Sequence, residues 1–232
     1  MDGPAPAPQL VIFDCDGVLV DSEMLSAGVL MAMMAGEGFP LSQEAFRSDF
    51  LGRSFAAAAL RAKERFGRPL PEDFESRYRD RLFAVLEDEL KAMDGVAEVL
   101  AQLRVPFCLA TSSTPRRLAL SLRASGLAQF FEGRCFTASE VKKGKPAPDL
   151  FLHAATRMGF APAQCLVIED SELGVRAGMA AGMEVWHFAG GCHVRAGYRL
   201  PSELMPQRAV PGMRELGAAF RELGLSSSAL SP

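Results

Sequence analysis

Two aspartates, Asp14 and Asp16, stand two residues apart directly after the short apolar segment Gln9 to Phe13, and Gly17 follows them. Aspartate is uncommon in strands and is costly beside a protein core unless its charge is paired or bound to a cation. A solvated turn also favours Asp before Gly, but it does not require the apolar run that comes immediately before. The arrangement therefore favours carboxylates that do chemistry, by nucleophilic attack, proton transfer or cation binding.

A second acidic pair, Glu169 and Asp170, follows the apolar run Cys165 to Ile168 and precedes Ser171. Acids at a helix start can simply complement the helix dipole. Because an earlier apolar run already ends in two carboxylates, a cation site built from oxygen ligands is the stronger interpretation, and Mg²⁺ fits it best. The three histidines and five cysteines have no H-E-x-x-H or C-x-x-C spacing, which leaves little from which to build a zinc site.

Hydroxyl and lysine side chains supply candidate contacts to an anion. Thr111 and Ser112 lie where an apolar run gives way to a helix start, a place that binds anions through hydroxyls and free N–H groups, although Ser and Thr are also common helix caps. Lys145 immediately precedes Pro146 in a loop that holds three lysines. Its charge can meet a phosphate group, whereas most loop lysines are simply solvated.

The elements that must position these residues are short buried strands. Apolar runs of strand-forming residues alternate with helical segments of about a dozen residues, which is typical of strand, helix, strand units and a parallel sheet. The carboxyl ends of parallel strands meet at one edge, so the polar clusters should converge on one crevice. The predicted strands are Gln9 to Phe13, Pro106 to Ala110, Arg134 to Thr137, Cys165 to Ile168 and Glu184 to Phe188.

The segment from Ser22 to Leu90 has a helical pattern throughout, with apolar residues every four positions, as at Leu25, Val29 and Met33. The simplest architecture inserts this segment after the first strand. We therefore predict an α/β fold with a Rossmann-like parallel sheet core and an inserted all-helical cap domain. The predicted core comprises residues 1–20 and 91–232, and the predicted cap comprises residues 21–90.

Composition excludes several classes of function. The chain has 232 residues, 49% of them hydrophobic and 23% charged, which is ordinary for a globular protein. A net charge of -3 without a basic stripe argues against nucleic acid as a partner. The longest apolar runs fall far short of the about 20 residues of a membrane helix, and residues 1–8 lack the pattern of a secretion signal. We expect a cytoplasmic monomer with reduced cysteines.

The order of the four clusters resembles the haloacid dehalogenase superfamily: D-x-D-G-x-x-x-D-S, a strand ending in Thr and Ser, Lys-Pro-x-Pro, then Glu-Asp-Ser. Within it, the chain is similar to the small-metabolite phosphatases and beta-phosphoglucomutases that carry a helical cap inserted after the first motif. The resemblance runs from Leu10 to about Leu223. It is strongest to 6-phosphogluconate phosphatase-like enzymes, which share the Asp-Cys-Asp-Gly start and the Ala-Gly-Met-Glu-Val stretch at Ala181 to Val185.

The resemblance implies roles for the acidic residues. Asp14 would be the nucleophile that forms an aspartyl phosphate, and Asp16 the general acid and base. Mg²⁺ would be held by the Asp14 side chain, the Asp16 backbone carbonyl and Asp170, with Glu169 helping directly or through water.

The resemblance also implies phosphate and substrate contacts. Thr111 and Lys145 would hold the phosphoryl oxygens, and Ser112 would assist. The stretch Phe50 to Ser54 resembles the family's specificity loop, so Arg53 would meet a hydroxyl or carboxylate of the substrate. A solvated loop charge is an equally good interpretation of Arg53.

The implied function is a Mg²⁺-dependent phosphatase that hydrolyses a small phosphorylated metabolite through an aspartyl-phosphate intermediate. The substrate would be a sugar phosphate or a sugar acid phosphate such as 6-phosphogluconate, because a closing cap admits only small ligands. The main alternative is a phosphosugar mutase of the beta-phosphoglucomutase type. Such mutases are expected to carry a His early in the first cap helix, where this chain has Ser26, and this difference favours hydrolysis.

A more remote alternative is a phospho-accepting signalling module of the receiver type, which uses similar residues. Receivers place the accepting Asp at a middle strand, whereas the middle strand here ends in Thr111, and the helical insertion has no counterpart in them. A binding protein without catalysis is the last alternative, and the complete set of acids argues against it.

Overall fold

The computed structural model of the protein describes residues 7–42, 44–46, 50 and 55–227. Its centre is a six-stranded sheet in the order β3-β2-β1-β4-β5-β6, in which every neighbouring pair is parallel. The strands are β1 (Leu10–Phe13), β2 (Phe107–Thr111), β3 (Cys135–Thr137), β4 (Cys165–Glu169), β5 (Glu184–Phe188) and β6 (Arg208–Val210). The predicted parallel sheet is confirmed.

The central strands are apolar because both of their faces are covered, and all residues of β1, β2 and β4 are buried. Their register brings the strand ends into line, since Phe13 pairs with Leu109 on one side and with Ile168 on the other. The next residue, Asp14, donates its backbone N–H to the Ile168 carbonyl at 3.0 Å. The first acidic motif therefore begins beside the end of β4, where the second acidic pair lies.

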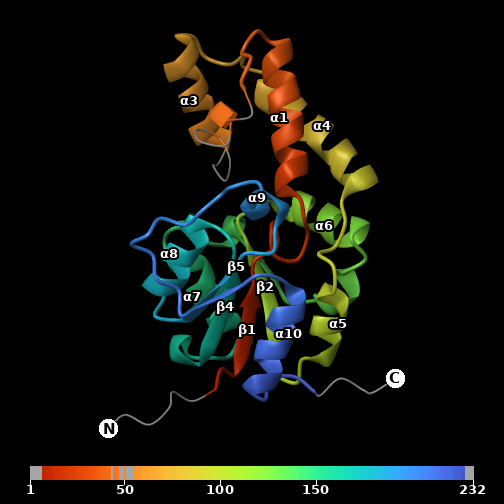
Figure 1. Ribbon diagram of the computed structural model, residues 1–232, viewed down its shortest axis with the longest axis vertical. Coiled ribbons are helices and arrows are strands. Elements are labelled where there is room, and N and C mark those ends of the chain that lie inside the picture. Colours follow the sequence, from red (N-terminus) through yellow and green to blue (C-terminus); the bar gives the residue numbers. More distant parts are fainter. Residues whose placement is uncertain (1–6, 43, 47–49, 51–54, 228–232) are drawn as a thin grey trace.

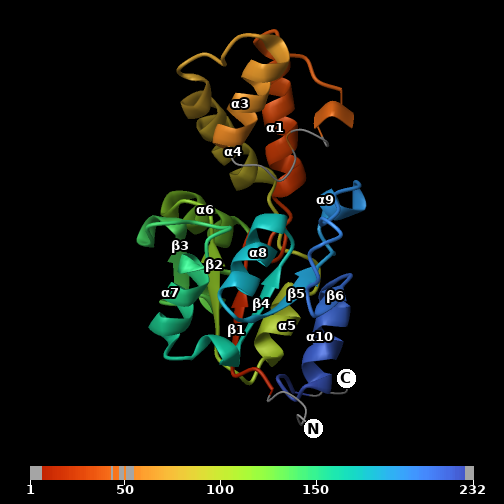
Figure 2. The same cartoon turned by 90° about the vertical axis from the view of Figure 1, so that its left-hand side faces the viewer.

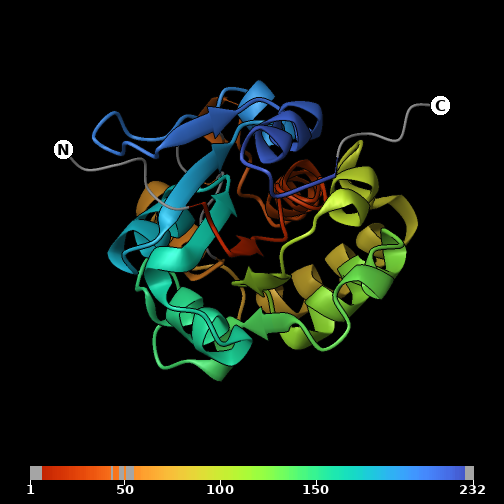
Figure 3. The same cartoon turned by 90° about the horizontal axis from the view of Figure 1, so that it is seen from below.

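Helices cover both faces of the sheet, as the view along the strands shows (Figure 3). Apolar residues of α5, α6 and α10 join Phe13 in one core cluster, in which Phe13 meets Phe107 and Phe220 edge to face. Residues of α7 and α8 form a second cluster with Leu10 and Ile12 on the other face. These helices are α5 (Val96–Gln102), α6 (Pro115–Ala124), α7 (Asp149–Met158), α8 (Glu172–Ala180) and α10 (Met213–Glu222).

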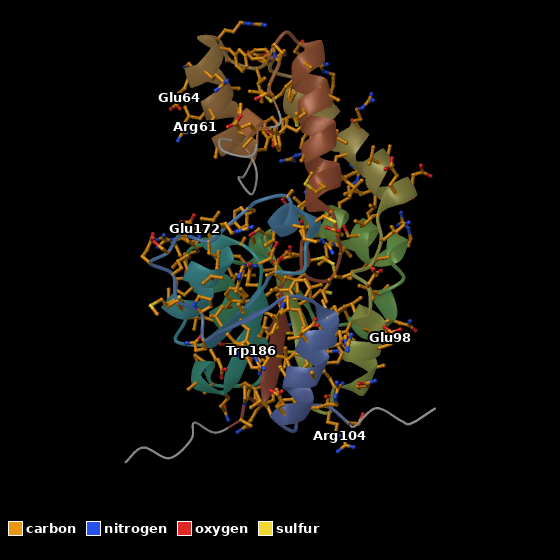
Figure 4. The ribbon with its side chains drawn as sticks, in the orientation of Figure 1. Arg61, Glu64, Glu98, Arg104, Glu172 and Trp186 are labelled. Carbon is orange, nitrogen blue, oxygen red and sulfur yellow. The ribbon has the colours of Figure 1, made fainter. Side chains whose placement is uncertain are left out.

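Three further helices, α1 (Glu23–Gly36), α3 (Phe55–Phe66) and α4 (Phe74–Glu89), lie beyond one end of the sheet (Figures 1 and 2). They share a separate apolar cluster, in which the Phe55 ring stacks on Phe74 and Tyr78. The charged pair Arg61 and Glu64 lies on the outer side of α3 (Figure 4). The predicted fold class, an α/β core with an inserted all-helical cap, is confirmed.

The predicted elements agree with the observed ones to within about a residue where the pattern is strong. Thr114 caps α6 by accepting the Arg117 backbone N–H, as its place before Pro115 predicts. The strand β6 was not predicted from the sequence, because three residues at a sheet edge give no recognisable alternation. Among the described residues, no helix has both the length and the apolar character needed to cross a membrane.

Candidate active site

The nucleophile predicted from the sequence, Asp14, is buried at the end of β1 and contacts a lysine from a distant loop. Lys145 Nζ lies 2.5 Å from Asp14 Oδ1 and 2.7 Å from Glu169 Oε1, and it donates to the Ala110 carbonyl at 3.1 Å. One ammonium thus joins the ends of β1, β2 and β4. The structure brings together Asp14, Lys145 and Glu169, which lie far apart in the sequence.

Asp14, Glu169 and Asp170 form a compact acidic cluster whose ligand oxygens lie within 4.8 Å of one another. Burial raises the pKa of Asp14 well above its ordinary value, and burial followed by the charge of Glu169 raises that of Asp170. Lys145 lowers the pKa of both carboxyl groups. Burial alone would lower the pKa of Lys145, but Asp14 and Glu169 outweigh it and raise that pKa above its ordinary value.

The cluster has the composition of a site for a hard divalent cation. One lysine faces three buried carboxylates, so the ionised cluster carries an excess of negative charge. Buried carboxylates of this kind need a cation, and oxygen ligands are those that Mg²⁺ prefers. The residues present therefore fit Mg²⁺. The Asp16 side chain lies outside this cluster, in keeping with the expected contribution of its backbone carbonyl only.

The carboxylate of Asp16 is held by hydrogen bonds from three side chains: Ser22 just before α1, Ser113 between β2 and α6, and Arg117 in α6. Ser22 Oγ donates at 2.5 Å, Ser113 Oγ at 2.6 Å and Arg117 Nη2 at 2.8 Å. Burial alone would raise the pKa of Asp16, but the Arg117 charge and these hydrogen bonds outweigh it and lower that pKa below its ordinary value. Asp16 is thus oriented separately from Asp14, as two carboxylates with different tasks require.

The hydroxyl residues after β2 differ in exposure. Thr111 is buried, and its Oγ1 accepts the Ser113 backbone N–H at 3.0 Å, which leaves its hydroxyl proton free for another acceptor. Ser112 is exposed and lines the cleft above the acidic cluster. Both residues therefore lie where the sequence analysis expected phosphate contacts. Arg53, the predicted specificity residue, lies outside the described residues.

The cleft measures about 500 Å³ and lies between the strand ends and the helical cap. This volume suits a small ligand. The cap side contributes both apolar and polar side chains: Leu30, Phe55, Leu82 and Phe83 are apolar, and Glu23, Ser26, Tyr78 and Arg79 are polar. The core side contributes the catalytic candidates, so a ligand in the cleft contacts both parts of the fold.

Two residues near the site were missed by the sequence analysis. Arg117 reaches from the first turn of α6 to Asp16 and, at 3.4 Å, to Ser26 Oγ on the cap helix α1. Arg117 lies three residues after the helix cap Thr114, in the first turn of a helix that follows a predicted strand. This position could have indicated that its side chain lies near the strand ends. His193, from the short helix α9 (Cys192–Arg195), contacts Asp170. Nothing in its local sequence marked it.

Comparison with known proteins agrees with this geometry. The family model described as haloacid dehalogenase-like hydrolase matches residues 8–182. A phosphorylated carbohydrates phosphatase of Thermotoga maritima is 34% identical over 185 residues, which cover 76% of this chain and 82% of the relative. The 6-phosphogluconate phosphatase of Escherichia coli is 27% identical over 186 residues, covering 80% of this chain and 84% of that enzyme.

A solved structure extends the similarity to the fold. A HAD family hydrolase from Deinococcus radiodurans, with bound phosphate and sodium, is 34% identical and superposes with a TM-score of 0.80, covering 97% of this chain and all of that one (100%). The chain belongs to the haloacid dehalogenase-like hydrolase family. The predicted enzyme class within it, a HAD-like phosphatase, is also confirmed. The match favours an enzyme over a receiver-type signalling module.

Proposed function

We propose that this enzyme is a Mg²⁺-dependent phosphatase that hydrolyses a small phosphorylated metabolite through a phosphorylated Asp14. The observation that carries the proposal is the contact of Lys145 with both Asp14 and Glu169 beneath a cleft of ligand size. A lysine there neutralises charge on transferred phosphoryl oxygens, and an adjacent carboxylate can attack phosphorus.

The acidic cluster supplies the cation site. Asp14, Glu169 and Asp170 would hold Mg²⁺ together with the Asp16 backbone carbonyl. When bound, the ion supplies positive charge that offsets the repulsion between the phosphoryl oxygens and the carboxylates. Thr111 and Ser112 would hold the remaining phosphoryl oxygens through their hydroxyls, and the Thr111 proton is not engaged by the described residues.

The reaction proceeds in two displacements at phosphorus. In the first, a carboxylate oxygen of Asp14 forms a bond to phosphorus, the bond to the leaving oxygen breaks, and Asp16 donates a proton to that oxygen. In the second, water attacks phosphorus, Asp16 takes a proton from the water, and the bond to Asp14 breaks, which releases phosphate. In the second step Asp16 recovers the proton that it gave up in the first, and its separate orientation by Ser22 and Ser113 suits this task.

We infer that the substrate is a sugar phosphate or a sugar acid phosphate such as 6-phosphogluconate. The cleft is lined by both apolar and polar side chains of the cap, which suits a ligand that has both C–H groups and hydroxyls, such as a sugar. Two relatives are named for phosphorylated carbohydrates and for 6-phosphogluconate.

The proposal includes residues 21–90 as the cap, residues 1–20 and 91–232 as the core, and Arg53 as a specificity residue.

A substrate panel tests this assignment. We expect the highest kcat/KM on a phosphorylated sugar or sugar acid, and much lower values on phosphoproteins, because the cap must close over the ligand. The panel includes sugar phosphates, 6-phosphogluconate, phosphoglycolate and nucleoside monophosphates. It also includes a glucose 1-phosphate mutase assay, since Ser26 stands where a mutase needs His. Efficient interconversion of glucose phosphates would overturn hydrolysis as the function.

Arg117 should matter most for substrates with poor leaving groups. Arg117→Gln removes the charge that holds Asp16 Oδ1, so we expect kcat/KM for an alkyl phosphate to fall about tenfold or more. An aryl phosphate should lose less, because its leaving group departs without a proton. Arg157→Gln, at an exposed arginine of α7, is the matched control. Equal losses on both substrates would contradict a role of Arg117 through Asp16.

A further inference from the structure

His193 contacts the acidic cluster from a segment that follows β5. Its Nε2 lies 3.0 Å from Asp170 Oδ2, and both side chains are buried. His193 is therefore a buried residue that contacts one carboxylate of the proposed cation site.

Two glycines make room for this contact. A Cβ on Gly17 would lie 1.9 Å from Asp170 Oδ2 and 3.1 Å from His193 Cε1. A Cβ on Gly191 would lie 2.6 Å from the same His193 carbon. Gly17 also has a φ of +86°, which other residues rarely adopt. The pair of Asp170 and His193 thus occupies a space that is left open by two positions without side chains.

The surroundings of the two ring nitrogens indicate which of them carries the proton of the neutral imidazole. His193 Nδ1 is buried and has no hydrogen-bond partner among the described residues. Nε2 is the ring nitrogen that lies near Asp170, at 3.0 Å, and a neutral imidazole that carries its single N–H on Nε2 has a bare lone pair on Nδ1. Such a donor holds the carboxylate without placing a second positive charge beside the cation.

The segment that carries His193 is anchored to fixed elements. Tyr198 packs against the imidazole with ring centroids 5.4 Å apart, and its hydroxyl accepts the Glu172 backbone N–H at 2.8 Å, at the first turn of α8. The Cys192 backbone N–H donates to Asp21 Oδ1 at 3.2 Å, at the entry to the cap. The imidazole therefore has a defined position relative to Asp170.

We propose that His193 is a positioning residue that fixes the Asp170 carboxylate through one oxygen so that its other oxygen meets Mg²⁺. The inference rests on the proposed Mg²⁺ dependence. It concerns a residue that contacts a metal-coordinating side chain, Asp170, and not the ion itself. Partners of this kind commonly change metal affinity by about 10- to 100-fold.

The test is Mg²⁺ binding to the full chain by isothermal titration calorimetry, without substrate. We expect His193→Asn, whose amide is too short to reach Asp170, to weaken Mg²⁺ binding about 10- to 100-fold. His193→Gln, whose amide nitrogen extends as far as Nε2, should recover much of the affinity. In hydrolysis of an aryl phosphate, the Mg²⁺ concentration for half-maximal rate should rise in parallel, with kcat at saturating Mg²⁺ changed far less. His153→Ala, at a partly buried histidine that pairs with Glu140, is the control.

Three results would overturn the role of His193, and a fourth would overturn the proposed cation dependence. If His193→Asn and the wild type bind Mg²⁺ equally, His193 does not position Asp170. The same holds if the variant only lowers the thermal unfolding midpoint without Mg²⁺, or if Gln and Asn lose the same affinity, because the role is then structural. A wild-type protein that binds no Mg²⁺ would refute the proposed cation dependence itself.

Discussion

Asp14→Asn should abolish hydrolysis of every phosphate monoester while leaving the fold intact. Loss of a covalent nucleophile typically costs on the order of 10⁵ to 10⁶ in kcat. The amide has the size of the carboxylate, so packing at the end of β1 is retained. Burial raises the pKa of Asp14, which means that its charge opposes folding at neutral pH. The variant should therefore unfold at the same or a higher temperature than the wild type when Mg²⁺ is absent.

The measurement is a steady-state assay with an aryl phosphate, paired with thermal unfolding. Asp94→Asn, at an exposed position on the chain, serves as the control and should retain full activity. A rate for Asp14→Asn within about tenfold of the wild-type rate would mean that Asp14 does not form the covalent intermediate.

Removal of Mg²⁺ should have the second large effect. Chelator-treated enzyme should lose turnover and recover it on addition of Mg²⁺, because the charge of Lys145 offsets only part of that of Asp14, Glu169 and Asp170. Mg²⁺ at 100 times its Kd adds about 2.7 kcal/mol to the free energy of unfolding. For a chain of this length, that corresponds to a rise of about 5–10 °C in the unfolding midpoint.

The comparison is made by differential scanning calorimetry and by the aryl phosphate assay on the same samples. In Asp170→Asn, the midpoint should respond to Mg²⁺ much less, since one of the three ligand oxygens loses its charge. Full turnover in excess chelator would rule out the metal assignment, whereas Na⁺ at equal ionic strength should reproduce neither effect.

The positions of the main candidate residues could be predicted because residues that follow parallel strands lie close together at one edge of the sheet. Asp14, Thr111 and Glu169 each lie at the carboxyl end of an apolar run, and a parallel sheet aligns those ends. Lys145 comes from a loop, so its contact with Asp14 could be expected only from the family resemblance. The apolar periodicity sufficed for the helical cap, because helices with a packed face repeat every three to four residues.

The contacts of Arg117 and His193 depend on tertiary detail that no periodicity encodes. Arg117 is exposed or buried according to how far α6 is rotated about its axis, and its pairing with Asp16 needs the cap nearby. His193 reaches Asp170 only because Gly17 and Gly191, distant in the sequence, both leave space for it. The proposed substrate recognition would depend likewise on side chains from several cap helices.

The most direct test of phosphoryl transfer to Asp14 is pre-steady-state hydrolysis of 4-nitrophenyl phosphate by Asp16→Asn. The leaving group departs without a proton, so Asp14 is still phosphorylated, whereas the second step lacks its general base and the intermediate accumulates. We expect a burst of about one nitrophenolate per enzyme, and acid-quenched protein heavier by about 80 Da on the peptide that contains Asp14. No burst and no added mass, with steady hydrolysis continuing, would contradict a covalent intermediate on Asp14.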